Sequence, residues 1–207
     1  EMDAALGRDQ VALDAARAAD QAEIAALAVD EMLLSEGAVI DGLREISRAI
    51  DSGIRPLQAF ICDELCKSDE CLRIKAKVES EAQEVFQASP DVFAKLAFGD
   101  RMDGIVVVAK APQRTLANLQ LPANPLVAVL EGVEKPGNVG AILRSADAAG
   151  VDTVIVADGR TDLYNPNTIR ASLGTVFRPN VCEATSAETI DWLESKNLAI
   201  VAARPDG

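Results

Sequence analysis

Histidine is absent from the 207 residues of this chain. Its absence excludes Ser-His-Asp and Cys-His nucleophile systems and any metal site built on imidazole ligands. The sequence also lacks an apolar run of about 18 residues, so no membrane-spanning helix is expected. The N-terminus is acidic and has no basic region of a signal peptide, which favours a cytoplasmic protein. Any chemistry must therefore rely on Arg, Lys, Asp, Glu, Ser or a bound cofactor.

Cysteine is sparse, with four residues at Cys62, Cys66, Cys71 and Cys182. The first three follow the spacing C-x3-C-x4-C, which matches no usual zinc pattern. We therefore expect no metal site. Because disulfides are rare in the cytoplasm, we expect all four cysteines to be reduced thiols.

Positive charge is also in short supply, since the formal net charge is −13. Residues 1–36 alone carry nine acidic and two basic residues. Non-specific nucleic-acid binding needs basic surface that displaces counterions, so this balance argues against it. If the chain binds nucleic acid, we expect a small basic cleft or a protein-rich substrate such as a ribosomal particle.

Hydrophobic periodicity divides the chain into four segments. Residues 1–36 are Ala-rich with apolar positions at helical spacing, and residues 37–111 alternate strands with helices. Prolines and little periodicity mark 112–124 as a linker, and the alternation resumes over 125–207, ending in a predicted strand, LAIVAA. Apolar strands without clean polar alternation favour a parallel sheet covered on both faces. The predicted fold class is therefore α/β.

One arginine stands inside an otherwise apolar helical pattern, in EKPGNVGAILRSADAAG after the strand LVAVL. A generic interpretation makes Asn138 the N-cap of a helix over 138–149 and pairs Arg144 with Asp147. A functional interpretation starts from Gly140, which lies one turn before Arg144 and has no side chain. The guanidinium could cross it toward the carboxyl end of the strand, where ligands bind in open α/β sheets.

Familiar nucleotide motifs do not fit this stretch. Gly137 and Gly140 bracket two residues, but the third glycine of G-x-G-x-x-G is missing, and no G-K-[ST] follows. A nucleotide-dependent oxidoreductase is therefore disfavoured. A second polar constellation, NPNTIRASLGTVFRPNV, holds Arg170 and Ser172 in a short segment that Gly174 ends.

Together, the two stretches resemble the first two motifs of the SpoU-type (TrmH-like) RNA ribose 2′-O-methyltransferases of the SPOUT superfamily. The resemblance covers about residues 125–207 and implies a SPOUT-type parallel sheet with helices on both faces. The first domain, with VIDGLREISRAIDSGI and GIVVVAKAP, resembles the small α/β domain, similar to a ribosomal protein, that precedes the catalytic domain in many members. The family's third motif, which threads the trefoil knot, would lie beyond Gly207.

The resemblance implies catalytic roles for Asn138 and Arg144, at the target ribose. Methyl transfer to a hydroxyl is an in-line displacement, in which the protein aligns the reacting atoms. A guanidinium keeps its proton at neutral pH, so we expect Arg144 to stabilise the developing alkoxide and to hold the adjacent phosphate. Asn138 would orient Arg144 or the ribose.

The resemblance also implies binding roles. The RNA-binding candidates are Arg44, Arg170 and Ser172. The cofactor would be S-adenosylmethionine, with Ala202 and Ala203 at the end of the predicted last strand lining its pocket and most contacts lying beyond Gly207. Expected partners are RNA, rRNA in preference to tRNA, and a second copy of the chain.

A different function stays open on the same residues. Without the third motif, the chain could be a non-catalytic RNA-binding relative that lacks the cofactor site. Residues beyond Gly207, if present, would separate this alternative from a methyltransferase.

Overall fold

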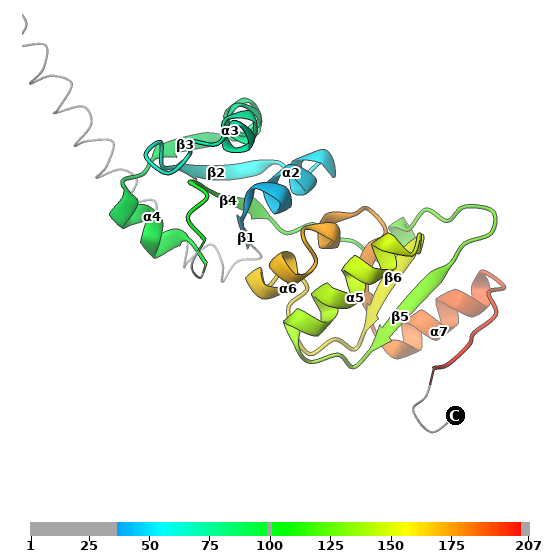
Figure 1. Cartoon of the computed structure of the whole chain (residues 1–207). Helices are drawn as coiled ribbons and strands as arrows, with labels where there is room; N and C mark the ends of the chain where they lie inside the picture. The colour runs from blue at the N-terminus through cyan, green and yellow to red at the C-terminus, as the bar shows by residue number, and fades with distance from the viewer. Residues whose placement is uncertain (1–36, 99–100, 204–207) are drawn as a thin grey trace, which may run out of the picture.

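The computed structural model describes residues 37–98 and 101–203. The acidic segment 1–36, predicted to be helical, lies outside the described residues. Two α/β units follow one another along the chain, each built on its own sheet (Figure 1). No helix in the described part of the chain is both long and apolar enough to cross a membrane.

The first unit is a four-stranded sheet in the order β1-β4-β2-β3. Strands β2 and β3 are parallel, whereas β4 runs antiparallel to both β1 and β2. Alternating side chains divide its core: Phe60 and Val106 pack with α4, and Ala59 and Val107 join the cluster on the side of α2 and α3. Its elements are β1 (Gly37–Asp41), α2 (Leu43–Asp51), β2 (Pro56–Ile61), α3 (Asp69–Glu81), β3 (Glu84–Gln87), α4 (Pro90–Leu96) and β4 (Ile105–Lys110).

The second unit is a three-stranded parallel sheet in the order β5-β6-β7. Val154 and Val156 of β6 pack in the cluster that holds α5 and α6, and Ile155 between them packs with Leu119 and Trp192 on the other face. The predicted parallel sheet covered on both faces is confirmed. Its elements are η1 (Leu116–Asn118), β5 (Val127–Glu131), α5 (Pro136–Ala148), β6 (Thr153–Ala157), α6 (Pro166–Ala171), η2 (Thr175–Phe177), β7 (Val181–Ala184) and α7 (Ser186–Ser195).

The two units share buried apolar packing. A single cluster includes Ile40 and Ile46 of the first unit together with Leu143, Ile169 and Phe177 of the second. Helix α6 packs against β1, and η2 packs against α2 (Figure 1). The segment between the sheets also contributes, because Leu119 is buried against the face of the second sheet. The units are therefore docked on one another as well as connected in sequence.

The predicted last strand, residues 198–203, is not formed. This segment has no regular structure, and Ile200 and Val201 are 55% and 92% exposed. A strand needs a neighbour to satisfy its backbone N–H and C=O groups. Among the described residues β5 pairs with β6 alone, so its other edge is open, but residues 198–203 form no ladder with it. Apolar composition alone therefore did not produce a strand at residues 198–203.

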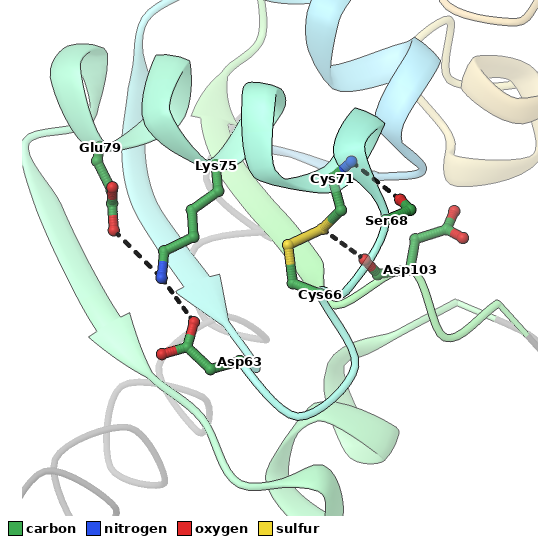
Figure 2. The surroundings of a disulfide bond; sticks show 7 residues. All are labelled: Asp63, Cys66, Ser68, Cys71, Lys75, Glu79 and Asp103. Carbon is green, nitrogen blue, oxygen red and sulfur yellow. Dashed lines mark hydrogen bonds and ion pairs between the residues drawn. A yellow bond between two sulfur atoms is a disulfide. The ribbon is translucent and has the colours of Figure 1, made fainter.

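The expectation of four reduced cysteines is wrong. Cys66 and Cys71 form a disulfide with their Cα atoms 5.4 Å apart (Figure 2), while Cys62 and Cys182 are free and buried. Ser68, the N-cap of α3, accepts a hydrogen bond from the Cys71 N–H at 3.1 Å. This cap turns the chain into the helix and brings the two Cα atoms within the range that a disulfide spans.

Candidate active site

Helix α5 carries the two predicted catalytic residues, and it begins earlier than the sequence predicts. Pro136 occupies the first helical position and Lys135 is the N-cap, because proline is pre-organised for that position and has no N–H to satisfy. Asn138 therefore lies inside the first turn, where its N–H donates to the Lys135 carbonyl at 2.9 Å. The expected N-cap role of Asn138 is wrong, and its exposed side chain is not used in capping.

Arg144 is exposed on α5 and has no hydrogen bond or ion pair with any residue that the structure describes. The expected pair with Asp147 does not form, because Asp147 binds the guanidinium of Arg178 instead. Arg144 therefore carries an unneutralised charge on the surface of the helix. Nothing among the described residues holds its guanidinium in place.

Gly140 has a different role from the one expected. It is buried, and a Cβ there would lie 2.6 Å from both the Ala171 Cβ and the Thr168 carbonyl oxygen, and 2.8 Å from the Ser172 nitrogen. The missing side chain therefore makes room for α6. The expected path of the Arg144 guanidinium across Gly140 is wrong, because α6 fills that space.

Asn138 and Arg144 are separated on the helix. Six residues place them about 9 Å apart along the axis and about a third of a turn apart around it. Neither residue lines any of the four cavities that we describe among residues 37–98 and 101–203. The described residues therefore present the two side chains to solvent and do not enclose them in a pocket.

The second motif forms a tightly packed turn after α6. Asn165 caps this helix by accepting from the Asn167 N–H at 2.9 Å. Ser172 is fully buried and donates its hydroxyl to the Ile169 carbonyl at 2.9 Å. Gly174, at a φ of 81°, takes the left-handed conformation that ends the turn. In this structure Ser172 holds the turn together and does not reach the surface where RNA was expected.

The two predicted RNA-binding arginines have different surroundings. Arg44 is exposed on α2 at the rim of a cavity of about 270 Å³. Arg170 instead points at the first unit: it donates to the Phe98 carbonyl, its guanidinium lies 5.5 Å from the centre of the Phe98 ring, and Asp41 is 3.9 Å away. Arg44 is therefore available to an external ligand, whereas the partners of Arg170 lie within the protein.

Buried acids lie around this contact. Asp41 and Glu45 are 4% and 1% exposed, and Glu45 pairs with Arg101 at 3.2 Å. Burial raises the pKa of Asp41 above its ordinary value, although Arg170 and the Phe98 N–H both act to lower it. Both acids belong to the junction between the units. Their positions could not be inferred from the sequence, because their partners lie far along the chain.

A second cavity, of about 380 Å³, lies between the linker and β7, and no motif in the sequence indicated it. Arg114 borders it and donates to the Phe177 carbonyl at 2.7 Å. Burial raises the pKa of Tyr164 to about 12 and that of Cys182 to about 11, so both side chains stay neutral at physiological pH.

The residues expected to contact the cofactor do not form a pocket. Ala202 and Ala203 are exposed in the irregular segment after α7, and neither lines the cavities described above. Ala202 and Ala203 therefore do not line a cofactor pocket among the described residues. The structure shows no cluster of three or more His, Cys, Asp or Glu able to hold a metal within its described part.

Comparison with known proteins gives a consistent result for the second unit. Residues 125–207 match the sequence profile described as the SpoU rRNA Methylase family. A Streptomyces viridochromogenes protein named 23S rRNA (uridine(2479)-2'-O)-methyltransferase is 30% identical over 168 residues, which cover 78% of this chain and 56% of that protein. The Bacillus subtilis 23S rRNA (guanosine(2553)-2'-O)-methyltransferase RlmP is 29% identical, covering 68% and 54%. The chain thus spans about half the length of these relatives.

Solved structures are similar to this chain over both units. A crystal structure described as an RNA 2'-O ribose methyltransferase is 38% identical with a TM-score of 0.69, over 82% of this chain and 64% of that one. The SpoU methyltransferase AviRb from Streptomyces viridochromogenes, in complex with the cofactor AdoMet, is 25% identical with a TM-score of 0.70, over 81% and 63%.

Proposed function

We propose that this chain takes part in transferring a methyl group to a ribose 2′-hydroxyl of rRNA, because residues 125–207 match the SpoU rRNA Methylase family profile. The names of the two curated relatives favour rRNA over tRNA as the substrate. In this proposal residues 37–111 bind the RNA, residues 125–207 carry the transfer chemistry, and residues 112–124 join them. The single observation that carries the proposal is the family motif on α5, which leaves Arg144 exposed and without a partner among the described residues.

Arg144 acts in this proposal through its charge. A guanidinium does not accept a proton at neutral pH, so it does not serve as the base. It donates two parallel hydrogen bonds to the phosphate beside the target ribose, and its charge stabilises the oxygen as it loses its proton. Asn138, exposed about one and two-thirds turns earlier on α5, orients the ribose. The proton leaves to water or to the phosphate.

S-adenosylmethionine, the methyl donor of this proposal, supplies the electrophilic methyl group. Support comes from the neighbouring SpoU structure, which holds AdoMet. Ala202 and Ala203 line none of the cavities described above, so we assign them no contact with the donor. A second copy of the chain is also part of the proposal, because α5, which carries the catalytic candidates, leaves the apolar side chain of Ile142 about two-fifths exposed.

On the RNA side we propose a contact for Arg44, which is exposed and unpaired among the described residues. We leave Ser172 out because it is buried, and Arg170 because protein groups surround it. The compartment that fits an rRNA substrate is the cytoplasm. There the Cys66–Cys71 disulfide would be exposed to reducing conditions.

The test is transfer of labelled methyl from S-adenosylmethionine to rRNA fragments by the complete protein. We expect Arg144→Ala to lower the rate at least about 100-fold, as loss of a transition-state donor does, and Arg144→Lys to lower it less. Lys196→Ala is the matched control, since it removes one positive charge at the far end of α7. RNA binding without transfer by the wild-type protein would favour the non-catalytic relative instead.

A further inference from the structure

We propose that Arg170 and Asp41 are positioning residues that dock α6 on the first sheet and so set where RNA held by the first unit meets α5. The inference rests on the proposed function for its catalytic consequence. Its structural part, a fixed orientation between the two units, can be tested without any activity.

Arg170 makes its contacts with the first unit through three different interactions. Its guanidinium donates to the Phe98 carbonyl, lies 5.5 Å from the centre of the Phe98 ring, and approaches Asp41 to 3.9 Å. Asp41 in turn accepts a hydrogen bond from the Phe98 N–H at 2.9 Å. These three residues therefore form one closed set of contacts across the junction.

The loop after α6 has a second point of attachment one turn further on. Arg48 of α2 donates to the Leu173 carbonyl at 3.0 Å. A Cβ on Gly174 would lie 3.0 Å from the Glu45 Cα, so the backbone of this loop is pressed directly against α2. These two attachments hold α6 and the loop that follows it against the first unit.

Helix α6 is equally close to α5 on its other side. The contact at Gly140 leaves no space for even one methyl group between the two helices. An unbroken series of packed elements therefore runs from the first sheet through α6 to the helix that carries Arg144. A shift at the Arg170 contact would be passed to α5, because such interiors are not continuously deformable.

Asp41 does not owe its place to a stabilising ion pair. It is 4% exposed, and burial outweighs its neighbours enough to raise its pKa. A buried carboxylate whose desolvation exceeds its pairing is weak evidence for stability. What the charge does provide is a directional acceptor for the Phe98 N–H and a partner that orients Arg170.

A direct RNA contact is the competing role for Arg170, and the geometry disfavours it. The side chain is only 25% exposed. A phosphate reaching it would approach the Asp41 carboxylate and would compete with the Phe98 carbonyl. Arg44 is exposed and has no contact with Asp41 or Phe98.

The structural test measures the distance between spin labels on the complete protein. Labels at Arg73→Cys on α3 and Asp191→Cys on α7 are selective, because the native cysteines are buried or in the disulfide. We expect a narrow distance distribution that broadens in both Asp41→Asn and Arg170→Ala, and stays narrow in the control Arg55→Ala. Unchanged distributions in both variants would overturn the proposal, whether or not the protein methylates RNA.

The kinetic test separates docking from RNA contact. Docking predicts that both variants lower kcat about 10- to 100-fold, as a displacement near 1 Å does, and leave the Kd for RNA within about twofold. The kcat of the double variant should be no lower than that of the less active single variant, since both substitutions break the same contact. A phosphate contact would instead make Arg170→Ala weaken RNA binding and reduce the salt slope by about one, with Asp41→Asn unaffected.

Discussion

Adding one methyl group at Gly140 should destabilise the second unit, although alanine favours helices more than glycine does. Within α5, alanine in place of glycine gains about 1 kcal/mol of helix propensity. At Gly140, however, the new Cβ would lie 2.6 Å from the Thr168 carbonyl oxygen and 2.8 Å from the Ser172 nitrogen. Both are backbone atoms, so no side-chain rotation relieves the overlap.

The size of the effect follows from these two opposing terms. Overpacking a closely packed contact costs about 1–3 kcal/mol, and more where backbone has to move. The net expectation for Gly140→Ala is a loss of up to about 2 kcal/mol in the free energy of unfolding. Gly137 provides the matched control in the same helix, because a Cβ there meets nothing within 4 Å. Gly137→Ala should therefore be neutral or stabilising by up to about 1 kcal/mol.

Urea unfolding followed by fluorescence measures this difference. Trp192 is the one tryptophan of the sequence and packs on the second sheet, opposite α5, so its signal reports on the second unit. Linear extrapolation of both variants and the wild type gives the free energies. If Gly140→Ala proves as stable as Gly137→Ala, then α6 does not fill the space beside Gly140, and the account of α5 and α6 packing is refuted.

Three further perturbations test the first unit. Gly42→Ala should cost about 1–3 kcal/mol in urea unfolding, because Gly42 has a φ of 97°; an unchanged midpoint would show that this turn tolerates a side chain. Reducing the Cys66–Cys71 disulfide, whose residues are five apart, should lower stability by about 2 kcal/mol, measured with and without dithiothreitol; equal curves would contradict it. Burial raises the pKa of Asp41 above 3.8, so its carboxyl binds a proton more tightly in the folded state than in the unfolded one. The stability that protonated Asp41 adds to the folded state is present below about pH 3.8 and is lost as pH rises through the folded pKa. The free energy of unfolding of the wild type should therefore fall relative to that of Asp41→Asn as pH rises across that window, and parallel pH profiles of the two proteins would disprove the shift.

Local patterns predicted most of the secondary structure correctly. The apolar run TVIVA became the fully buried central strand β6. Ser89 followed by Pro90 predicted the start of α4, and Ser89 indeed accepts from the Val92 N–H. These features depend on neighbours in the sequence, where propensity and capping act.

Contacts between residues far apart in the sequence could not be predicted from these local patterns. Arg170 meets Phe98 across 72 positions, so nothing in its own motif indicated that it faces the first unit. Gly140 looked like space for an arginine, but a helix about 30 residues away fills that space. The predicted strand at 198–203 failed for a related reason, since strand formation requires a partner that local composition does not reveal.

The position of the transferred methyl group tests the central claim most directly. After reaction with labelled S-adenosylmethionine, the rRNA is hydrolysed in alkali, which cleaves only next to a free 2′-hydroxyl. The account predicts label in alkali-resistant dinucleotides with the wild-type protein and with Lys196→Ala, and its loss with Arg144→Ala. Label released in mononucleotides, or an undiminished dinucleotide signal from Arg144→Ala, would contradict the assignment of Arg144 to the ribose 2′-hydroxyl.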